Sequence, residues 1–224
     1  MIQLQDVTKV YNEGRPNEVW AVRGITLGLS PNRVTVFKGP SGSGKTTLLA
    51  MIGALSRPTS GRITLDGRLL SNLPERFMTD VRRSTFGFIF QRFNLIRGLS
   101  VLENVMLPAY PLAPDYASLK RKALGLLRQF RLEGKAGSSV EWLSGGEAQR
   151  TAICRALIND PRVLIADEPT ASLDTRLSQE LIGLLGDLSD LGRTVLVSSH
   201  DPIVFEASRV SSVIEMRDGQ LAEA

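Results

Sequence analysis

The chain has 224 residues, 42% of them hydrophobic, with 27 lysines and arginines against 23 acidic residues. This length and hydrophobic content suffice for one large domain with its own core and exclude a disordered chain. The net charge of +4 is modest and spread along the sequence, so charge alone does not indicate nucleic-acid binding. The single Cys154 excludes an internal disulfide, and the N-terminus lacks a secretory signal pattern. We expect a protein of a reducing compartment that does not itself span a membrane, because no apolar run is long enough.

Short segments rich in apolar and β-branched residues recur along the chain and predict strands. They cover residues 2–7, 19–29, 33–37, 62–65, 85–90, 163–167, 194–198 and 209–216. Helical patterns cover residues 46–55, 116–130, 147–158 and 179–191. Strands that alternate with helices are typical of an α/β fold with a parallel sheet. Residues from about 92 to 160 contain prolines and helical patterns, and we expect them to form a mostly helical insertion.

The segment after the third predicted strand matches the phosphate-binding pattern G-x-x-x-x-G-K-[ST] and opens a predicted helix. Glycines let the backbone approach phosphates, and successive N–H groups at a helix N-terminus carry partial positive charge. Lys45 adds a full charge, and the hydroxyl of Thr46 is a ligand for Mg²⁺. The alternative is a glycine-rich turn that binds nothing. We expect a nucleoside triphosphate to contact Gly39, Pro40, Ser41, Gly42, Ser43, Gly44, Lys45, Thr46 and Thr47.

Two acids, Asp167 and Glu168, end an apolar segment that predicts a buried strand. In a phosphate-loop protein an aspartate at this position lies beside the loop and holds Mg²⁺, and the next glutamate orients and deprotonates the attacking water. We therefore expect Asp167 to be a metal ligand and Glu168 to be the general base. The alternative, two solvated acids before a proline, does not account for their combination with the phosphate loop.

Residues 143–147, with the sequence LSGGE, stand directly before a predicted amphipathic helix. Ser144 and Glu147 fit a capping box, so a simple helix start is one interpretation. However, glycine destabilises a helix by about 1 kcal/mol relative to alanine, and two occupy this first turn. Glycines are favoured where backbone approaches an anion. In this segment the sequence resembles the ATP-binding cassette (ABC) ATPases, whose LSGGQ-type signature is present as the variant LSGGEAQR.

The resemblance covers nearly the whole chain and implies an architecture. A RecA-like parallel-sheet core with an N-terminal antiparallel β part would comprise residues 1–91 and 161–224, and a helical signature subdomain would comprise residues 92–160. It also implies roles for single residues. Tyr11 would stack on adenine, Gln91 would contact Mg²⁺ and the attacking water, and His200 would contact the γ-phosphate. Asp174 belongs to a segment with Ser172 that would cross a dimer interface.

The resemblance further implies partners and cofactors. Two chains, most simply identical ones, would enclose two ATP molecules and Mg²⁺ head to tail, with Lys45 of one chain facing a signature of the other. The signature residues that would contact nucleotide are Ser144, Gly145, Gly146 and Glu147. A monomer would then be half an enzyme.

Local features are similar to the lipoprotein-release, macrolide-export and FtsE-like ATPases, although Ala171 and Ser172 replace the residues common there. This similarity implies an ATPase peripheral to the cytoplasmic face of the inner membrane, which drives a separate permease in export or mechanical work. Phe93 and Leu95 would help to receive a helix of that permease. No nucleic acid is expected. The alternative is a soluble ABC ATPase acting on nucleic acid or ribosomes, and a metabolic kinase does not explain the signature.

Overall fold

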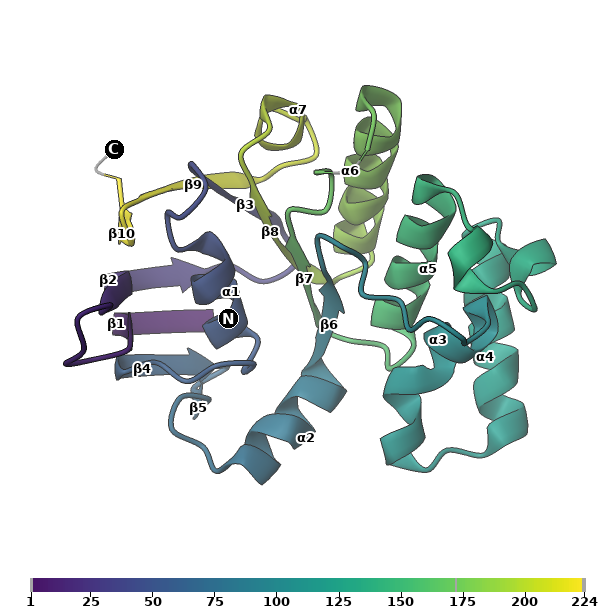
Figure 1. The fold of residues 1–224 in the computed structure, drawn as a ribbon, viewed down its shortest axis with the longest axis horizontal. Helices are drawn as coiled ribbons and strands as arrows, with labels where there is room; N and C mark the ends of the chain where they lie inside the picture. The colour runs from purple at the N-terminus through teal and green to yellow at the C-terminus, as the bar shows by residue number, and fades with distance from the viewer. Residues whose placement is uncertain (1, 172, 223–224) are drawn as a thin grey trace.

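The strands of the computed structural model, which describes residues 2–171 and 173–222, form two sheets (Figure 1). One sheet is antiparallel, in the order β2 (Val19–Leu29), β1 (Ile2–Tyr11), β4 (Ser60–Leu65) and β5 (Arg68–Leu69). The other has the order β10 (Gln220–Leu221), β9 (Ser212–Arg217), β3 (Val34–Lys38), β8 (Thr194–Ser199), β7 (Val163–Asp167) and β6 (Phe86–Ile89). Its strands are parallel except for β10. The predicted α/β fold with a parallel sheet is confirmed.

The central strands β3, β7 and β8 of the parallel sheet are buried on both faces, to which they send alternate side chains. On β7, Val163 and Ile165 join the core beneath the antiparallel sheet, whereas Leu164 and Ala166 join the core on the other face. A strand that is covered on both sides has no polar face, so it is a continuous apolar run in the sequence. This burial explains why these strands were readily predicted.

Helix α1 (Lys45–Ile52) lies between the two sheets and fills the space with Leu48, Leu49 and Ile52 (Figure 1). It ends before Ala54, whose left-handed φ of 55° is incompatible with a continuing helix. The helix is therefore shorter than the predicted 46–55. Its N-terminus is placed at the carboxyl end of β3, which is where ligands bind in open α/β sheets.

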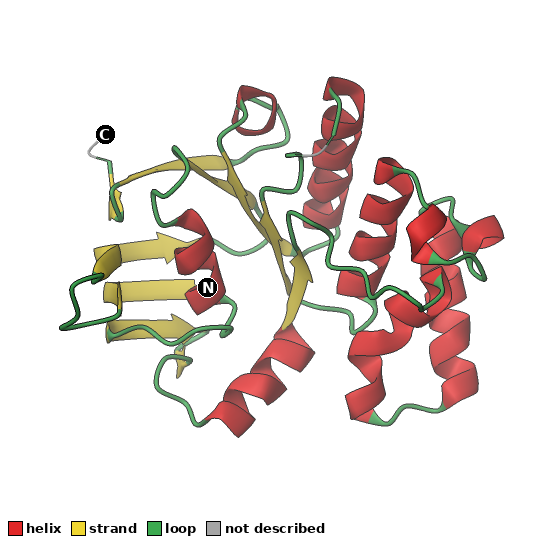
Figure 2. Cartoon of the chain, viewed as in Figure 1, coloured by secondary structure: helices red, strands yellow, loops and turns green. Residues whose placement is uncertain are grey.

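Helices occupy the segment between β6 and β7 (Figure 2). They are α3 (Val101–Met106), α4 (Tyr116–Gln129) and α5 (Gly145–Leu157), joined by 3₁₀ turns at Leu107–Leu112, Glu133–Lys135 and Val140–Trp142. Side-chain caps fix three of the helix starts, with Ser100 on α3, Asp115 on α4 and Ser144 on α5. Such caps satisfy backbone N–H groups that have no partner within the helix.

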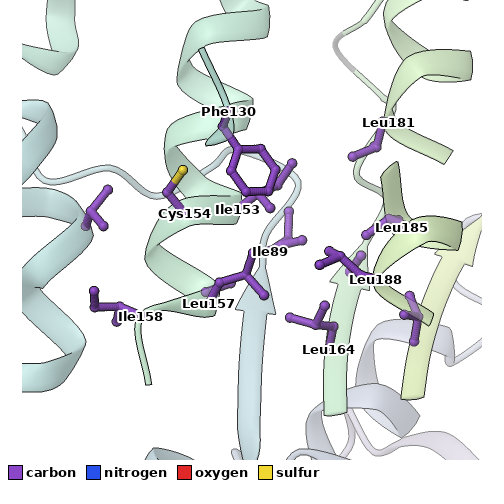
Figure 3. Close-up of a cluster of buried hydrophobic side chains, with 14 of the residues drawn as sticks. Ile89, Phe130, Ile153, Cys154, Leu157, Ile158, Leu164, Leu181, Leu185 and Leu188 are labelled. Atoms are coloured by element: carbon purple, nitrogen blue, oxygen red, sulfur yellow. The ribbon is translucent and has the colours of Figure 1, made fainter. Parts of the chain in front are cut away.

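One continuous apolar cluster joins these helices to the parallel sheet (Figure 3). On α5, Ile153, Cys154 and Leu157 belong to this cluster, together with Ile89 of β6 and Phe130, which follows α4. Helix α6 (Thr175–Asp190) contributes a stripe to the same cluster, namely Leu181, Leu185 and Leu188. The signature helix is therefore packed directly against the strands that end at the site described below.

Several elements differ from the prediction. Helix α2 (Glu75–Thr85) was not expected, because it is rich in charged residues and buries only Met78. Helix α6 starts earlier than residue 179 because Asp174 caps it through the N–H of Leu177 at 2.8 Å. Strand β1 continues past residue 7 because irregular register with β2 accommodates its polar end. A short helix α7 (Pro202–Phe205) follows β8. Among the described residues, no helix combines the length and hydrophobicity needed to cross a bilayer.

Candidate nucleotide-binding and hydrolysis site

A cavity of about 310 Å³ lies where strands of the parallel sheet end. The phosphate loop follows β3, Gln91 follows β6, Glu168 follows β7 and His200 follows β8, so four separate chain segments meet there. The start of β2 closes one side. The lining residues are Val19, Trp20, Ala21, Ser41, Gly42, Ser43, Gly44, Lys45, Thr46, Thr47, Gln91, Glu168 and His200.

The phosphate loop needs glycine at its two ends for steric reasons. Gly44 has a φ of 96°, and a Cβ there would lie 2.2 Å from the carbonyl oxygen of Ala21. Gly39 has a φ of 153°, and a Cβ there would lie 2.2 Å from the carbonyl oxygen of Met216. Any side chain at these positions would push the loop away from β2 and β9. The glycines therefore set the curvature of the loop around the cavity.

Lys45 is 95% buried at the start of α1 and crosses back over the loop. Its Nζ donates hydrogen bonds to the carbonyl oxygens of Gly39 at 2.8 Å and Pro40 at 2.9 Å. It also lies 3.4 Å from Ser43 Oγ and 3.7 Å from Glu168 Oε1. The shortest contacts of this buried ammonium are to neutral carbonyls, and the carboxylate of Glu168 lies farther away. In such a site of low dielectric the ammonium attracts an anion more strongly than it would in water.

Oxygen atoms suited to Mg²⁺ lie together at the ends of α1 and β7. Thr46 Oγ1 donates a hydrogen bond of 2.8 Å to Asp167 Oδ1, and Ser198 Oγ donates one of 2.6 Å to the same atom. Within residues 2–171 and 173–222, no group of three or more His, Cys, Asp or Glu side chains could hold a metal alone. This chemistry fits Mg²⁺, which binds through one or two protein oxygens and completes its shell with phosphate oxygens and water.

Glu168 and His200 form a pair at the mouth of the cavity. His200 Nδ1 lies 3.0 Å from Glu168 Oε2. Glu168 has a left-handed φ of 44°, and its N–H donates to both the carbonyl oxygen and Oγ of Ser198, at 3.1 and 2.9 Å. Such a conformation is costly for a non-glycine residue and requires strong support from its surroundings. The bonds to Ser198 supply that support and aim the carboxylate at the cavity.

The expected aromatic residue does not line the cavity. Tyr11 ends β1, is 41% exposed, and contacts Lys9, whose Nζ lies 5.1 Å from the ring centroid. Trp20 lines the cavity instead and donates from Nε1 to Glu18 Oε1 at 2.7 Å. Trp20 was not expected at the site, because no motif in the neighbouring sequence indicates ligand binding. Tyr11 as the adenine contact remains a prediction that the structure does not test.

The signature lies at the start of α5. None of its residues is among the described residues that line this cavity. Ser144 Oγ accepts from the N–H of Glu147 at 3.3 Å, and Glu147 Oε2 accepts from the N–H of Ser144 at 2.9 Å, which completes a capping box. The Ser144 backbone N–H, with smaller contributions from its hydroxyl and Lys135, holds the pKa of Glu147 below its ordinary value. Gly145 faces open space, whereas a Cβ on Gly146 would lie 3.3 Å from Leu177.

The remaining predicted site residues have local roles in this chain. Asp174 accepts from the N–H of Leu177 and caps α6. Ser172, expected beside it, lies outside the described residues. Gln149, for which no contact was predicted, donates from Nε2 to the carbonyl oxygen of Pro169 at 3.0 Å.

A phosphate loop, an oxygen pair suited to Mg²⁺ and a carboxylate aimed at the cavity define this protein as a P-loop ATPase. Residues 22–171 match the family model described as ABC transporter. The chain belongs to the ABC transporter family and is an ATP-binding, ATP-hydrolysing cassette of the kind found in that family. The expected resemblance is thus confirmed.

Relatives of known sequence include export proteins. A macrolide export ATP-binding/permease protein MacB of Hyphomonas neptunium is 42% identical over 99% of this chain, which covers 34% of that protein. A pyoverdine export ATP-binding/permease protein PvdT of Pseudomonas entomophila is 38% identical, again over 99% of this chain and 34% of the relative. This chain thus spans about a third of their length. An ABC transporter ATP-binding protein of Thermotoga maritima is 37% identical over 99% of this chain and 93% of its own length.

Solved cassette structures have the same fold. The dimeric structure of MJ0796, described as a bacterial ABC transporter cassette, has a TM-score of 0.90 and 37% identity, covering 100% of this chain and 97% of its own. A post-hydrolysis MJ0796 dimer bound to ADP and Pi gives the same values. The cbiO1 structure from Clostridium perfringens, part of the transporter complex cbiONQ, has a TM-score of 0.86 and 27% identity, over 99% of this chain and 86% of its own.

Proposed function

We propose that this cassette is the motor subunit of an export-type ABC transporter, in which ATP-driven closure of a head-to-tail dimer drives a separate membrane subunit. One observation carries the proposal. Ser144 begins α5 away from the cavity that Lys45 and Glu168 line, so the signature cannot act on the nucleotide of its own chain without a large rearrangement. A second chain supplies the missing half of each site. The dimeric MJ0796 structures support this arrangement.

Within one site, each side chain has a role that follows from its position. Lys45 and the loop N–H groups bind the phosphates. Thr46 and Asp167 would hold Mg²⁺, which would supply positive charge to neutralise the phosphate oxygens. Glu168 accepts a proton from the attacking water, whose oxygen bonds to the γ-phosphorus while the bond to the bridging oxygen breaks and ADP leaves. His200, 3.0 Å from Glu168, orients the carboxylate and contacts the γ-phosphate. Gln91, which also lines the cavity, positions the water.

The other half of the site comes from the partner chain. Ser144, Gly145 and Gly146 lie at the N-terminus of α5. The backbone N–H groups of the first turn of a helix favour an anion. We expect these residues to close on the γ-phosphate bound by Lys45 of the other chain, with Asp174 near the interface. ATP thereby holds two chains together, and hydrolysis removes the bridging phosphate and releases them.

The membrane subunit binds, in this proposal, to a groove beside Gln91. A cavity of about 440 Å³ there is lined by Arg92, Phe93, Leu95, Arg97, Val140, Glu141 and Ala148. Half-buried Phe93 and Leu95 offer an apolar surface, and exposed Arg92 and Arg97 outnumber the single acid Glu141. This lining suits a short amphipathic helix that carries acidic residues. Residues 92–160 act as one helical subdomain that bears both this groove and the signature. The chain is then peripheral to the cytoplasmic face of the inner membrane, and similarity to export proteins favours outward transport.

The proposal is tested by capture of the membrane subunit. Tagged Glu168→Gln chain with Mg-ATP is incubated with detergent-solubilised membranes of the native cell, beside the same chain carrying Leu95→Asp. We expect an integral membrane protein to bind stoichiometrically to the first chain and not to the second, because the introduced carboxylate replaces an apolar side chain that lines the groove. Recovery of ribosomes or nucleic acid from the soluble fraction, with equal capture by both chains, would contradict the proposal.

A further inference from the structure

The signature helix α5 is hydrogen-bonded to two loops of its own chain through two buried side chains. Gln149, 4% exposed, donates from Nε2 to the carbonyl oxygen of Pro169 at 3.0 Å. Arg155, 8% exposed, donates from Nη1 to the carbonyl oxygen of Asn94 and from Nη2 to that of Phe93, both at 2.5 Å. All of these acceptors are backbone atoms, so the contacts hold the course of the chain rather than individual side chains.

The two loops are the ones that carry hydrolytic residues. Pro169 directly follows Glu168, and Phe93 is two residues after Gln91. Both Gln91 and Glu168 line the nucleotide cavity. Each of the three acceptors therefore lies within three residues of a catalytic side chain along the backbone. A shift of about 1 Å in a catalytic group can reduce turnover about 100-fold.

The loop after Gln91 has an unusual backbone that depends on such support. Phe93 and Asn94 have left-handed φ values of 57° and 48°, an uncommon conformation for consecutive residues with side chains. Their carbonyl oxygens face the two arms of one guanidinium. Because guanidinium is planar and donates along two parallel directions, it can hold both carbonyls at once, which the single ammonium of lysine cannot do in the same geometry.

The burial of Arg155 has an energetic cost, because a charged group leaves water. Its burial lowers the pKa of the guanidinium. Within the described part of the chain no carboxylate forms an ion pair with it, and its partners are the two loop carbonyls. A buried cation is stabilised only by well-placed hydrogen bonds, so the cation and the loop conformation depend on each other.

We propose that Arg155 and Gln149 are positioning residues through which the signature helix sets the positions of Gln91 and Glu168 in its own chain. The proposal rests on the hydrolytic roles given to Gln91 and Glu168 above. When the N-terminus of α5 is drawn to a partner's nucleotide, the helix shifts both loops together. Occupation of one site is then transmitted through a single rigid element to the other site of the dimer.

The test compares kcat, KM for ATP and thermal stability in purified full-length variants. Arg155→Met and Gln149→Leu remove the donors, and Arg155→Lys keeps the charge. Ile153→Ala is the matched control, because Ile153 lies on the same helix, is 1% exposed and packs in the apolar core. Nucleotide binding without hydrolysis is followed by energy transfer from Trp20 to a fluorescent ATP analogue in a Trp142→Phe background, where Trp20 is the only tryptophan.

We expect Arg155→Met and Gln149→Leu to lower kcat about 10-fold to 100-fold while KM and analogue affinity change less than about threefold. The kcat of Arg155→Lys should lie between that of Arg155→Met and that of the unaltered chain. Ile153→Ala should lower Tm at least as much as Arg155→Met and Gln149→Leu do, but its kcat should stay within about twofold of that of the unaltered chain. If Arg155→Met does not fold, Gln149→Leu and Arg155→Lys carry the comparison with Ile153→Ala.

Two outcomes would overturn the inference. One is an unaltered kcat in Gln149→Leu and in the arginine variants that fold. The other is a loss of kcat in Ile153→Ala that matches theirs at the same decrease in Tm, which would mark the effect as general destabilisation. Failure of the unaltered chain to hydrolyse Mg-ATP would instead contradict the proposed function, so the two failures are distinguishable.

Discussion

Ser198 Oγ donates a hydrogen bond of 2.6 Å to Asp167 Oδ1, across two neighbouring strands of the parallel sheet. The same hydroxyl accepts from the N–H of Glu168 at 2.9 Å, and its residue is fully buried. One small side chain therefore fixes both the expected metal ligand and the expected general base. Residues that orient the ligands of a metal contribute strongly to metal affinity, although they do not touch the metal.

The Ser198→Ala variant should lower ATP hydrolysis about 10-fold and raise the Mg²⁺ concentration that gives half-maximal activity, because Asp167 loses a donor that orients it. A titration of ATPase activity against Mg²⁺ measures both effects. The neighbouring Ser199→Ala is a matched control, since Ser199 is equally buried but bonds to the N–H of Asp201. Identical titrations of the two variants would rule out this role of Ser198.

Removal of the general base should stop turnover without preventing nucleotide binding. Glu168→Gln keeps the size of the side chain but cannot accept the proton, so hydrolysis should fall by about 10²–10⁴-fold. ATP should then accumulate in a stable dimer, visible by light scattering at saturating Mg-ATP. Glu133→Gln, which only disrupts the exposed pair with Arg128, should retain activity and form no lasting dimer. A Glu168→Gln chain that stays monomeric would argue against the dimer mechanism.

The two capping boxes separate a structural role of the signature from a functional one. Ser100 with Glu103 caps α3, just as Ser144 with Glu147 caps α5. Ser100→Ala and Ser144→Ala should each destabilise the fold by about 1 kcal/mol, measured by urea unfolding. Only Ser144→Ala should also weaken ATP-dependent dimer formation, because it alone removes a contact to the partner's phosphate. Equal dimer formation by both variants would show that Ser144 only caps the helix and does not contact the partner's phosphate.

The thiol of Cys154 should be unreactive in the folded protein. Burial raises its pKa to about 12, and the residue is fully buried in the same apolar cluster as Phe130. Reaction with a disulfide reagent at pH 8 should therefore proceed only as fast as the protein unfolds, and should become rapid in guanidinium. Fast labelling of the native chain by this assay would be inconsistent with the buried position of Cys154.

The same raised pKa links this thiol to stability. Its contribution is fully present below the unfolded-state pKa of about 8.5 and is lost as pH rises toward the folded-state value. Cys154→Ala should abolish that part of the alkaline loss of stability. Urea unfolding of both chains between pH 8 and pH 10 measures the difference, and parallel pH profiles would contradict the linkage.

Contiguous patterns were sufficient for much of the site. The phosphate loop, the acids at the end of β7 and the signature each combine residue type with a local conformation. Their chemistry could therefore be predicted before any contact was known. The central parallel strands could also be predicted, because a strand buried on both faces is a continuous apolar run in the sequence. Charge-rich α2 and the early start of α6 were not, since neither has a strong apolar period at its boundary.

Contacts between distant segments could not be anticipated. Ser198 and Asp167 are 31 residues apart and become partners because β8 pairs with β7 in a register that places them side by side. Arg155 lies 62 residues from Phe93, and Trp20 enters the cavity only because β2 begins beside the phosphate loop. The sequence alone was sufficient to predict the family, the fold class and the groups expected to bind nucleotide, because each of these depends on residue patterns that are local in the chain. Only the tertiary structure decided which buried side chains hold those groups in place, because strand order and register arise from packing across the whole chain.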